Sequence, residues 1–411
     1  MKDRKILNVL ISLIMMAIVL MTLYYLVYEE NYPRFLILPW GIYGLVLLVC
    51  FFSYTFRWLP KQTKIDTLKE ARVIAIIPAY NEDPELLKNT IRSIQEQTFK
   101  VQEIHVVDDG SVPEVKPYEA KDVVWHRQEN KGKRHAQGCA INHIEEQTVD
   151  FILTVDSDSV LAKNAVEKLI MAFEADKEVM GATGFVVTRN YNTNWITRIS
   201  DINIGVSCFV TRASRSITGS LETTSGALSM YRKEILFDNL PHYLNSGTYS
   251  DDRQLCMYSE IAGKAIGVQE ALVFSDMPTT FKGLWNQRKR WGKGGWKYFP
   301  FQVTNLSVVD LFFPFLGMVQ WTTVPAFYLI VAVALSQGHY NFIYFYIVLK
   351  LSTRYLEAAI YLLGSPHMKS GEKFLSWLFI TPFDFFLTTF VLVFAKFSAL
   401  FALREDHWLT R

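Results

Sequence analysis

The chain has 411 residues, enough for one or two domains with a substantial core. Half of the residues are hydrophobic, including 29 Phe, 20 Tyr and 10 Trp, which is high for a purely soluble protein. The net charge of only +2 argues against a nucleic-acid-binding protein. The four cysteines (Cys50, Cys139, Cys208 and Cys256) show no metal-ligand spacing, which favours reduced structural thiols.

The first predicted elements are two apolar segments. Residues 6–27 carry no charge, and as a helix they would reach roughly 33 Å, enough to cross a hydrocarbon core of about 30 Å. A second span fits residues 35–56. The basic start of the chain could be a signal-peptide n-region. We favour a retained helix, because the apolar run is long and no small-residue cleavage site follows it.

Orientation follows from the distribution of Lys and Arg beside the apolar segments. Residues 57–73 contain five basic side chains, whereas the 28–34 loop contains one Arg and two Glu. The region after the second span is therefore predicted to be cytoplasmic, and the chain to be a multi-pass plasma-membrane protein.

The central region alternates short β-branched runs with helical stretches. Strands are predicted at 73–77, 104–107 and 151–155, and helices at 84–97, 134–146 and 162–175. Continuous apolar runs separated by helices are typical of a parallel sheet covered on both faces. The fold class is therefore α/β, and in such sheets ligands bind beyond the carboxyl ends of the strands.

Acidic motifs follow all three predicted strands: PAYNED at 78–83, DDGS at 108–111 and DSDS at 156–159. A solvated loop edge is one explanation for such residues. The other is a divalent cation, because Asp156 and Asp158 supply the hard oxygen ligands that suit Mg²⁺ or Mn²⁺. Since Mg²⁺ tends to share its shell with substrate phosphates, this second explanation implies a nucleotide diphosphate partner.

Three more apolar segments lie at 308–336, 341–363 and 374–402. Whether the last one crosses the membrane, re-enters or lies in the interface is left open. Lys350, Arg354 and Glu357 share one helical face within the second segment. They form either an ion pair confined between helices or a polar strip along the path of a polymer, to which Asp384 and the Pro382 break could also belong.

The central region resembles the family-two inverting glycosyltransferases, which have a nucleotide-sugar-binding fold called GT-A. Among these it is most similar to the class I hyaluronan synthases of streptococci. The matching stretches occur in order: IPAYNED, VVDDGS, NKGKRHAQ (130–137), LTVDSDS, ATGFVVTRN (182–190), SITGS (216–220), SGALSMYRKEI (225–235), SDDRQL (250–255) and QRKRW (287–291). The resemblance implies a Rossmann-like mixed sheet inserted between transmembrane helices.

The resemblance also implies a role for each motif. Residues implied to bind the UDP-sugar are Tyr80, Glu82, Asp108, Lys131, Lys133, Arg134 and Asp156. Asp158, with Asp156, would hold the metal ion. Asp252 would be the catalytic base that deprotonates the acceptor hydroxyl, and Asp251 would support it. The alternative for these two acids is a pair of charged helix-cap residues.

QRKRW matches the QxxRW signature of processive synthases. Residues implied to contact the acceptor or gate its entry are Gln287, Arg290, Trp291, Ser225 and Gly226. An interfacial amphipathic helix is a compatible interpretation of this tryptophan-rich and basic stretch.

The implied organisation has four parts: membrane helices at 1–60, the GT-A domain at 61–280, interfacial helices at 281–306 and channel-forming segments at 307–411. The implied activity is polymerisation of UDP-GlcA and UDP-GlcNAc into hyaluronan and its export, with membrane lipids as partners and the oligomeric state open. Alternatives are another β-linked polysaccharide (poly-N-acetylglucosamine, cellulose-like or capsular), a single transfer to a lipid phosphate, or a transporter or sensor without catalysis.

The sequence departs from the streptococcal pattern at several positions. The Gly before the two acids is Ser250, and Ala227 ends a stretch that reads Cys-Ser-Gly-Pro in the family. Thr211 replaces a Glu, and Leu409 interrupts the C-terminal Trp-Gly-Thr-Arg. These changes fall near the implied acceptor region, so they put the alternation of two sugars in doubt rather than the use of UDP-sugars.

Overall fold

The computed structural model describes residues 63–118, 120, 122–247 and 250–404, together with the isolated positions 14, 17, 21 and 24. Apart from those four positions, the two predicted N-terminal spans lie outside the described residues. The C-terminal stretch 408–411 does as well.

One eight-stranded mixed sheet forms the centre of the domain, in the order β3-β2-β1-β4-β7-β6-β8-β5. Its strands are β1 (Val73–Ala79), β2 (Glu103–Asp108), β3 (Val123–Arg127), β4 (Phe151–Thr154), β5 (Val160–Leu161), β6 (Val179–Thr188), β7 (Ser229–Arg232) and β8 (Lys264–Ser275). Strands β3, β2, β1 and β4 are parallel neighbours, whereas β7 is antiparallel to both β4 and β6. The sequence predicted β1, β2 and β4 but not the antiparallel half.

Parallel register brings the acidic motifs to one edge of the sheet. Ala79 at the end of β1 is level with Asp108 at the end of β2, and Ile76 is level with Thr154 at the end of β4. The chain therefore leaves β1, β2 and β4 on the same side, where the site is built.

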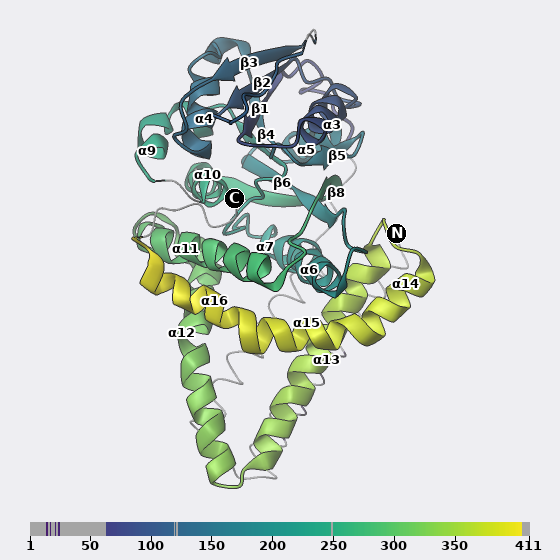
Figure 1. Ribbon diagram of the computed structural model, residues 1–411. Helices are drawn as coiled ribbons and strands as arrows, with labels where there is room; N and C mark the ends of the chain where they lie inside the picture. The colour runs from purple at the N-terminus through teal and green to yellow at the C-terminus, as the bar shows by residue number, and fades with distance from the viewer. Residues whose placement is uncertain are drawn as a thin grey trace.

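Helices α3 (Pro84–Gln95), α4 (Lys133–Ile141), α5 (Ala165–Ala175) and α10 (Asp251–Ala262) pack around the sheet (Figure 1). Asp83 caps α3 by accepting hydrogen bonds from the amides of Glu85 and Leu86, at 2.8 and 3.1 Å. Helix α4 ends at residue 141, not 146 as predicted, because the chain turns there and buries Ile144 and Val149 in the core.

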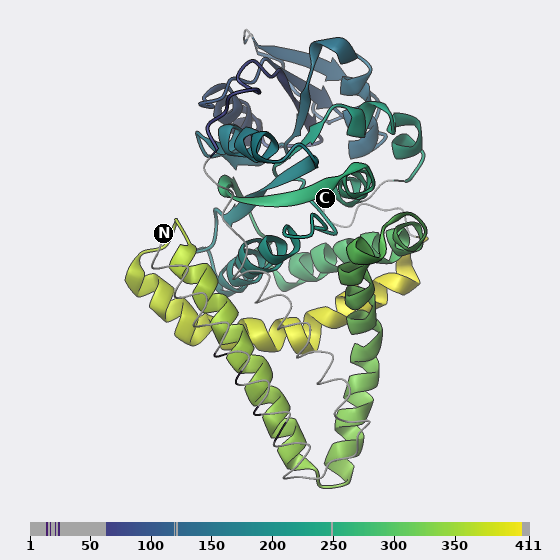
Figure 2. The ribbon, with the colours of Figure 1, turned by 180° about the vertical axis from the view of Figure 1, so that it is seen from behind.

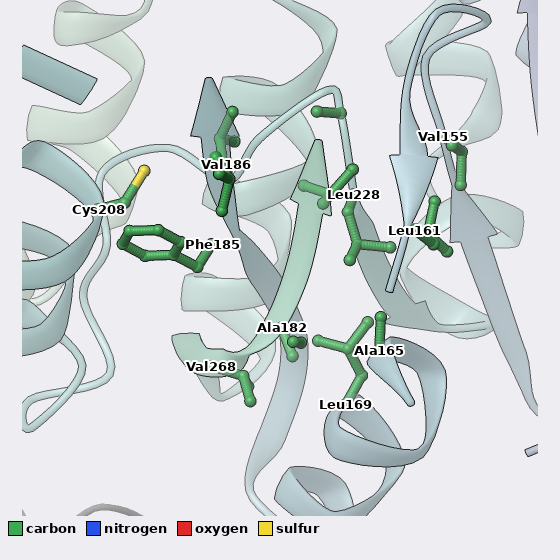
Figure 3. Close-up of a cluster of buried hydrophobic side chains, with 14 of the residues drawn as sticks. Val155, Leu161, Ala165, Leu169, Ala182, Phe185, Val186, Cys208, Leu228 and Val268 are labelled. Atoms are coloured by element: carbon green, nitrogen blue, oxygen red, sulfur yellow. The ribbon is translucent and has the colours of Figure 1, made fainter. Parts of the chain in front are cut away.

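The two faces of the sheet carry separate hydrophobic clusters. Along β1, Ala75 and Ile77 join the larger cluster, whereas Ile74 and Ile76 join the other. This alternation is the period of two that a strand imposes, with both faces buried. Figure 3 shows part of the larger cluster, where Leu169 lies close to Ala182, on β6.

A second set of helices lies on one side of the domain. Its long members are α6 (Trp195–Val206), α11 (Phe281–Asn305), α12 (Val308–Ser336) and α13 (Tyr340–Gly364). The short segments between the strands and helices are η2 (Glu146–Thr148), η3 (Ser207–Arg212), α7 (Ala213–Arg215), α8 (Glu234–Phe237) and α9 (Leu240–Leu244). Helices α12 and α13 extend away from the sheet and meet at a turn, as both views show (Figures 1 and 2). Their bounds agree with the predicted segments 308–336 and 341–363.

The last helix runs from Ser370 to Ala402 and passes beneath α11, across the domain-side ends of α12 and α13 (Figure 2). It comprises α14 (Ser370–Leu375), η4 (Ser376–Ile380), α15 (Thr381–Leu387), η5 (Thr388–Leu392), α16 (Val393–Ser398) and η6 (Ala399–Ala402). Pro382 does not break it, because it lies in the first turn of α15, directly after the π-helical turn η4. Among the described residues, this is the one helix long and apolar enough to cross a membrane.

Candidate active site

The centre of the site is the ammonium of Lys133, at the first residue of α4. Its Nζ lies 2.6 Å from Oδ1 of Asp156 and 2.9 Å from Oδ2 of Asp251. One acid follows β4 and the other begins α10, so the lysine joins two motifs that are about a hundred residues apart in sequence. Burial alone would lower the pKa of Lys133, but the two carboxylates outweigh it and raise the pKa, so the lysine stays charged.

Helix α10 begins with the two acids, and their surroundings differ. Burial raises the pKa of Asp251, but the charge of Lys133 and its hydrogen bond outweigh burial, so the pKa is lowered. For Asp252, burial and then the neighbouring charge of Asp251 raise the pKa. Asp251 is thus the ion-pair partner, and Asp252 is the better proton acceptor.

The loop after Glu222 closes the site from the side of β7. A Cβ atom added at Gly226 would lie 2.9 Å from both Oδ2 of Asp156 and Nζ of Lys133, so a larger residue here would require these two side-chain ends to shift. The amide of Ser225 donates to Oγ1 of Thr183 at 2.9 Å, and Oγ1 of Thr224 donates to the backbone carbonyl of Asp252 at 2.8 Å. These bonds hold the predicted Ser225–Gly226 pair beside the two acidic motifs.

Glu222 anchors the same loop through two arginines. Its carboxylate accepts from Arg253 at 3.1 Å and from Arg215. Burial opposes the ionised form of Glu222, but the two guanidinium groups outweigh it and lower its pKa to about 2. The sequence analysis did not single out this cluster.

The residues after β1 and β4 meet at the other side of Asp156. Oγ of Ser157 donates to Oε2 of Glu82 at 2.7 Å, and Tyr80 is exposed on 37% of its surface. Asp156 and Asp158 together offer carboxylate oxygens, with no Cβ at Gly226 to fill the space beside them. This donor set fits Mg²⁺ or Mn²⁺, which are held through one or two carboxylates plus substrate phosphates.

Asp108 and Asp109 organise the loops around the site. Asp108 accepts from the amide of Ser111 at 2.9 Å and pairs with Arg127. Asp109, which the sequence analysis did not assign, accepts from the amides of Lys131 and Gly132 at 3.0 and 2.8 Å. It therefore positions the start of α4, and the double acid of DDGS was the available signal.

The structure gives the three predicted basic residues different surroundings. Lys133 lies between the acids, and Lys131 is exposed. Arg134 is buried, with its guanidinium 5.2 Å from the ring centroid of Tyr243 and bonded to the hydroxyl of Tyr298 at 2.6 Å. Because Tyr298 belongs to α11, Arg134 connects α4 to α11.

QRKRW lies in the first half of α11. Trp291 is exposed on 39% of its surface, and the guanidinium of Arg288 lies 4.2 Å from its ring centroid. Gln287 and Arg290 are half-buried on the same helix. Three residues after Trp291, a Cβ added at Gly294 would come within 2.6 Å of Cβ of Ser250, so α11 meets the start of α10 there.

Glycines let α11 contact three neighbours closely. Besides Gly294 against Ser250, a Cβ at Gly292 would lie 2.9 Å from Cα of Lys396 in α16, and one at Gly295 would lie 2.6 Å from the ring of Trp321 in α12. Small residues permit such close helix approach. Ser250 itself has a φ of 63°, which explains why glycine is the family's residue at this position.

Arg354 and Glu357 of α13 take part in ion pairs. Arg354 bonds to Glu357 at 3.0 Å and also pairs with Asp384 of α15, which is fully buried. Asp384 in turn accepts from Thr388 at 3.1 Å. The contact of Arg354 with Asp384 is an ion pair between helices, and a polar strip along a polymer path stays a prediction.

Comparisons with known proteins identify similar chains. The family model described as glycosyl transferase family 2 matches residues 74–238. The chain is 37% identical over 278 residues to the hyaluronan synthase of Streptococcus pyogenes serotype M1, a match covering 62% of this chain and 65% of that protein. It is 32% identical over 245 residues to an N-acetylglucosaminyltransferase of Rhizobium meliloti (strain 1021), covering 56% of this chain and 57% of the relative. The chain thus spans less than two thirds of the length of the relatives it matches.

A solved structure shares the fold. The mannosyltransferase of Pyrobaculum calidifontis, in complex with GDP-Man and Mn²⁺, superposes with a TM-score of 0.51 over 96% of this chain and 100% of that chain, at 17% sequence identity. The predicted GT-A-type mixed sheet is therefore confirmed.

Proposed function

We propose that this chain, whose residues 74–238 form a family 2 glycosyltransferase domain, is a membrane-integrated processive synthase that builds a β-linked polysaccharide from UDP-sugars. The favoured product is hyaluronan, made from UDP-GlcA and UDP-GlcNAc. The observation that carries the proposal is the position of Lys133, 2.6 Å from Asp156 and 2.9 Å from Asp251. It brings Asp156, at the phosphate end of the proposed donor site, to the start of α10, which carries the proposed base Asp252.

The proposed reaction is a single displacement with inversion. The Asp252 carboxylate takes the proton of the acceptor hydroxyl as that oxygen attacks the anomeric carbon of the donor. The bond from the anomeric carbon to the diphosphate oxygen breaks, and UDP leaves with the electron pair. The raised pKa of Asp252, caused by burial and by Asp251, makes its carboxylate a stronger base for this step.

The departing UDP would be stabilised by the part of the site that contains Asp156, Asp158 and Lys133. Asp156 and Asp158 would hold Mg²⁺ or Mn²⁺, which supplies positive charge for the diphosphate. Lys133, kept charged by its two acids, contributes a further charge at the same place. Gly226 leaves room for a phosphate oxygen beside Asp156, because a Cβ there would occupy that space.

Uridine recognition is assigned to the ends of β1 and β2. The exposed ring of Tyr80 offers a stacking surface, and Glu82 is held in place by Ser157. Asp108 holds the loop after β2 through its bonds to Ser111 and Arg127. The exposed side chain of Lys131 is assigned to the nucleotide, whereas buried Arg134 positions α4 against α11.

The acceptor is assigned to the side of α11. Trp291 would give its exposed ring to the acceptor sugar, with Gln287 beside it and Arg290 toward the diphosphate. Ser225 and Gly226 would border the acceptor and gate its entry. The junction of Gly294 with Ser250 supports this, because it fixes α11 directly against the start of the base-bearing helix.

Membrane integration and export are assigned to residues 1–60 and to the helices from 307 onward. Large apolar side chains are exposed along the final helix, namely Phe374, Leu375, Phe379, Phe383, Phe386 and Phe401. Exposed apolar surface on this scale needs cover, which lipid would supply. The catalytic domain would then face the cytoplasm of a plasma-membrane protein.

Purified protein in detergent tests the proposal. With Mn²⁺ or Mg²⁺ and radiolabelled UDP-sugars, supplied singly and in pairs, we expect a long labelled product. Incorporation only when UDP-GlcA and UDP-GlcNAc are both present identifies hyaluronan, whereas incorporation from one sugar alone identifies another β-linked polysaccharide. Transfer of a single sugar to lipid, or binding without transfer, would overturn the processive assignment.

A further inference from the structure

A cluster of histidines and one cysteine lies at the opposite end of α4 from Lys133. His126 belongs to β3, at the edge of the sheet, Cys139 to the last turns of α4, and His143 to the loop that follows. One ligand atom from each of these three residues lies within 4.8 Å of the other two. Neither the catalytic proposal nor the membrane helices use this cluster.

Hydrogen bonds fix which ring nitrogens face the cluster. Nε2 of His126 is 2.9 Å from Nδ1 of His105, and Nε2 of His105 is 3.3 Å from the carboxylate of Glu103. The carboxylate of Glu103 accepts a hydrogen bond from Nε2–H of His105, so Nδ1 of His105 accepts one from Nε2–H of His126. Nδ1 of His126 is left with its lone pair.

His143 is oriented in the same way by the backbone. Its Nδ1 donates to the carbonyl of Cys139 at 2.7 Å, so Nε2 carries the lone pair. Fixing a histidine tautomer through a carboxylate or a backbone carbonyl is the arrangement found around metal-ligating histidines.

We propose that His126, Cys139 and His143 form a binding site for a thiolate-preferring divalent metal, Zn²⁺ or its analogue Co²⁺, with Glu103 and His105 as the outer layer. The ligands are Nδ1 of His126, Sγ of Cys139 and Nε2 of His143. Two imidazoles and one thiolate match the N/S ligand set of tetrahedral zinc, and the exposure of His143 leaves a fourth position for water. Binding releases the thiol proton of Cys139.

The ligand chemistry separates this site from the catalytic one. Asp156 and Asp158 offer only hard oxygens, whereas this cluster offers nitrogen and sulfur, so the two ends of α4 select different metals. A bound ion would tie the edge strand β3 to the end of α4, two elements joined otherwise by packing and loops. We therefore assign the site a role in holding α4, and with it Lys133, in place.

Cobalt binding to the full-length, metal-free protein in detergent tests the site. We expect one equivalent of Co²⁺ to give a sulfur-to-cobalt charge-transfer band and the visible bands of tetrahedral cobalt, both lost when Zn²⁺ is added. Cys139→Ser should abolish the charge-transfer band, and His143→Gln, at an exposed position, should weaken binding at least 10-fold. Glu103→Gln, in the outer layer, should weaken it about 10- to 100-fold.

Matched control variants test whether the cobalt spectrum arises from this cluster. Cys208→Ser and His339→Gln change a thiol and an imidazole elsewhere in the chain and should leave the cobalt spectrum unchanged, and Asp156→Asn should also leave it unchanged. A wild-type spectrum without the thiolate band, or a band that persists in Cys139→Ser, would overturn the proposal. If Cys139→Ser does not fold, unweakened binding in His143→Gln would overturn it equally.

Discussion

The two ends of α4 differ in the atoms that surround them. At the first residue, Lys133 lies among the carboxylates of Asp156 and Asp251. At the other end, Cys139 and His143 face His126 with sulfur and nitrogen. A nine-residue helix thus separates a charged, oxygen-lined site from a soft-ligand cluster.

This difference shows how a single helix can serve two kinds of chemistry. The oxygen-lined end is built from residues that follow strands of the parallel sheet, where loops from distant parts of the chain meet. The sulfur and nitrogen end is built on the edge strand, away from that meeting point. Changes at one end should therefore leave the ligand chemistry of the other intact, and the predictions below test this.

The largest effect is expected for Asp252→Asn. Removing the proton acceptor should lower polymer synthesis about 10²- to 10⁴-fold, because general bases contribute on that scale. UDP binding should remain, since the substitution leaves Asp156, Asp158 and Lys133 in place. Scintillation counting of labelled polymer, with UDP binding measured by calorimetry, checks both outcomes. Asp238→Asn changes an exposed aspartate and should leave polymer synthesis unchanged. Full synthesis by Asp252→Asn would show that Asp252 is not the base.

Lys133→Met should cost about 3 kcal/mol of stability, at the low end for a broken buried ion pair because Asp156 is partly exposed. UDP-sugar affinity should fall as well. Lys131→Met, which changes an exposed lysine two residues earlier, should stay within about 0.5 kcal/mol of wild type. Denaturant unfolding and donor titration measure the two variants, and equal effects in both would contradict the central position of Lys133.

Zn²⁺ at a concentration 100 times its Kd should stabilise the domain by about 2.7 kcal/mol. Thermal unfolding should therefore shift upward in wild type and in Asp156→Asn, but not in Cys139→Ser. Mn²⁺ at the same concentration should give no shift that depends on Cys139. If the zinc-dependent shift is lost in Asp156→Asn and kept in Cys139→Ser, the two ends of α4 do not differ in metal preference as proposed.

Asp251→Asn should move the acid limb of the activity profile to lower pH. Asp252 must be deprotonated to act as the base, and the charge of Asp251 raises its pKa, so removing that charge lowers the pKa. The pH dependence of kcat/KM for wild type and variant measures the shift. An acid limb that stays in place or moves upward would show that another group controls it.

The smallest effect is expected for Ser250→Gly at the start of α10. Ser250 has a φ of 63°, and glycine relieves the cost of this left-handed conformation, so stability should rise by about 1 kcal/mol. Ser250→Ala keeps the Cβ and should not stabilise. Thermal unfolding of the two variants side by side distinguishes conformational relief from loss of the hydroxyl.

The residues of the oxygen-lined end could be predicted because each acidic motif directly follows a recognisable apolar strand. Asp156 and Asp108 were placed at the same sheet edge on this basis. The partnership of Lys133 with Asp251 could not be predicted, because it depends on where α10 lies relative to α4. Likewise, Arg134 was predicted to contact the nucleotide. Its burial against Tyr298 could not be predicted, because that contact depends on where α11 lies.

The histidine and cysteine cluster was missed for a different reason. Its ligands belong to a strand, a helix and a loop, and the strand, β3, has only five residues and was not predicted. Without that strand, the position of His126 in the fold could not be predicted. Cys139 remained one of four cysteines without metal-ligand spacing. The antiparallel strands were missed as well, since their place in the sheet is set by long-range pairing rather than local pattern.

Gly292 and Gly294 of α11 have a mechanical consequence. Gly292 faces the backbone of Lys396, and Gly294 faces the short side chain of Ser250, so no long flexible side chain lies at either contact to absorb a small shift, and close-packed interiors transmit strain. A sliding movement of α16 past Gly292 would thus push on α11 as a rigid rod, and Gly294 would pass the displacement to the serine that precedes the two acids. Under the proposed function, a shift of the final helix would therefore reach the proposed base through this contact.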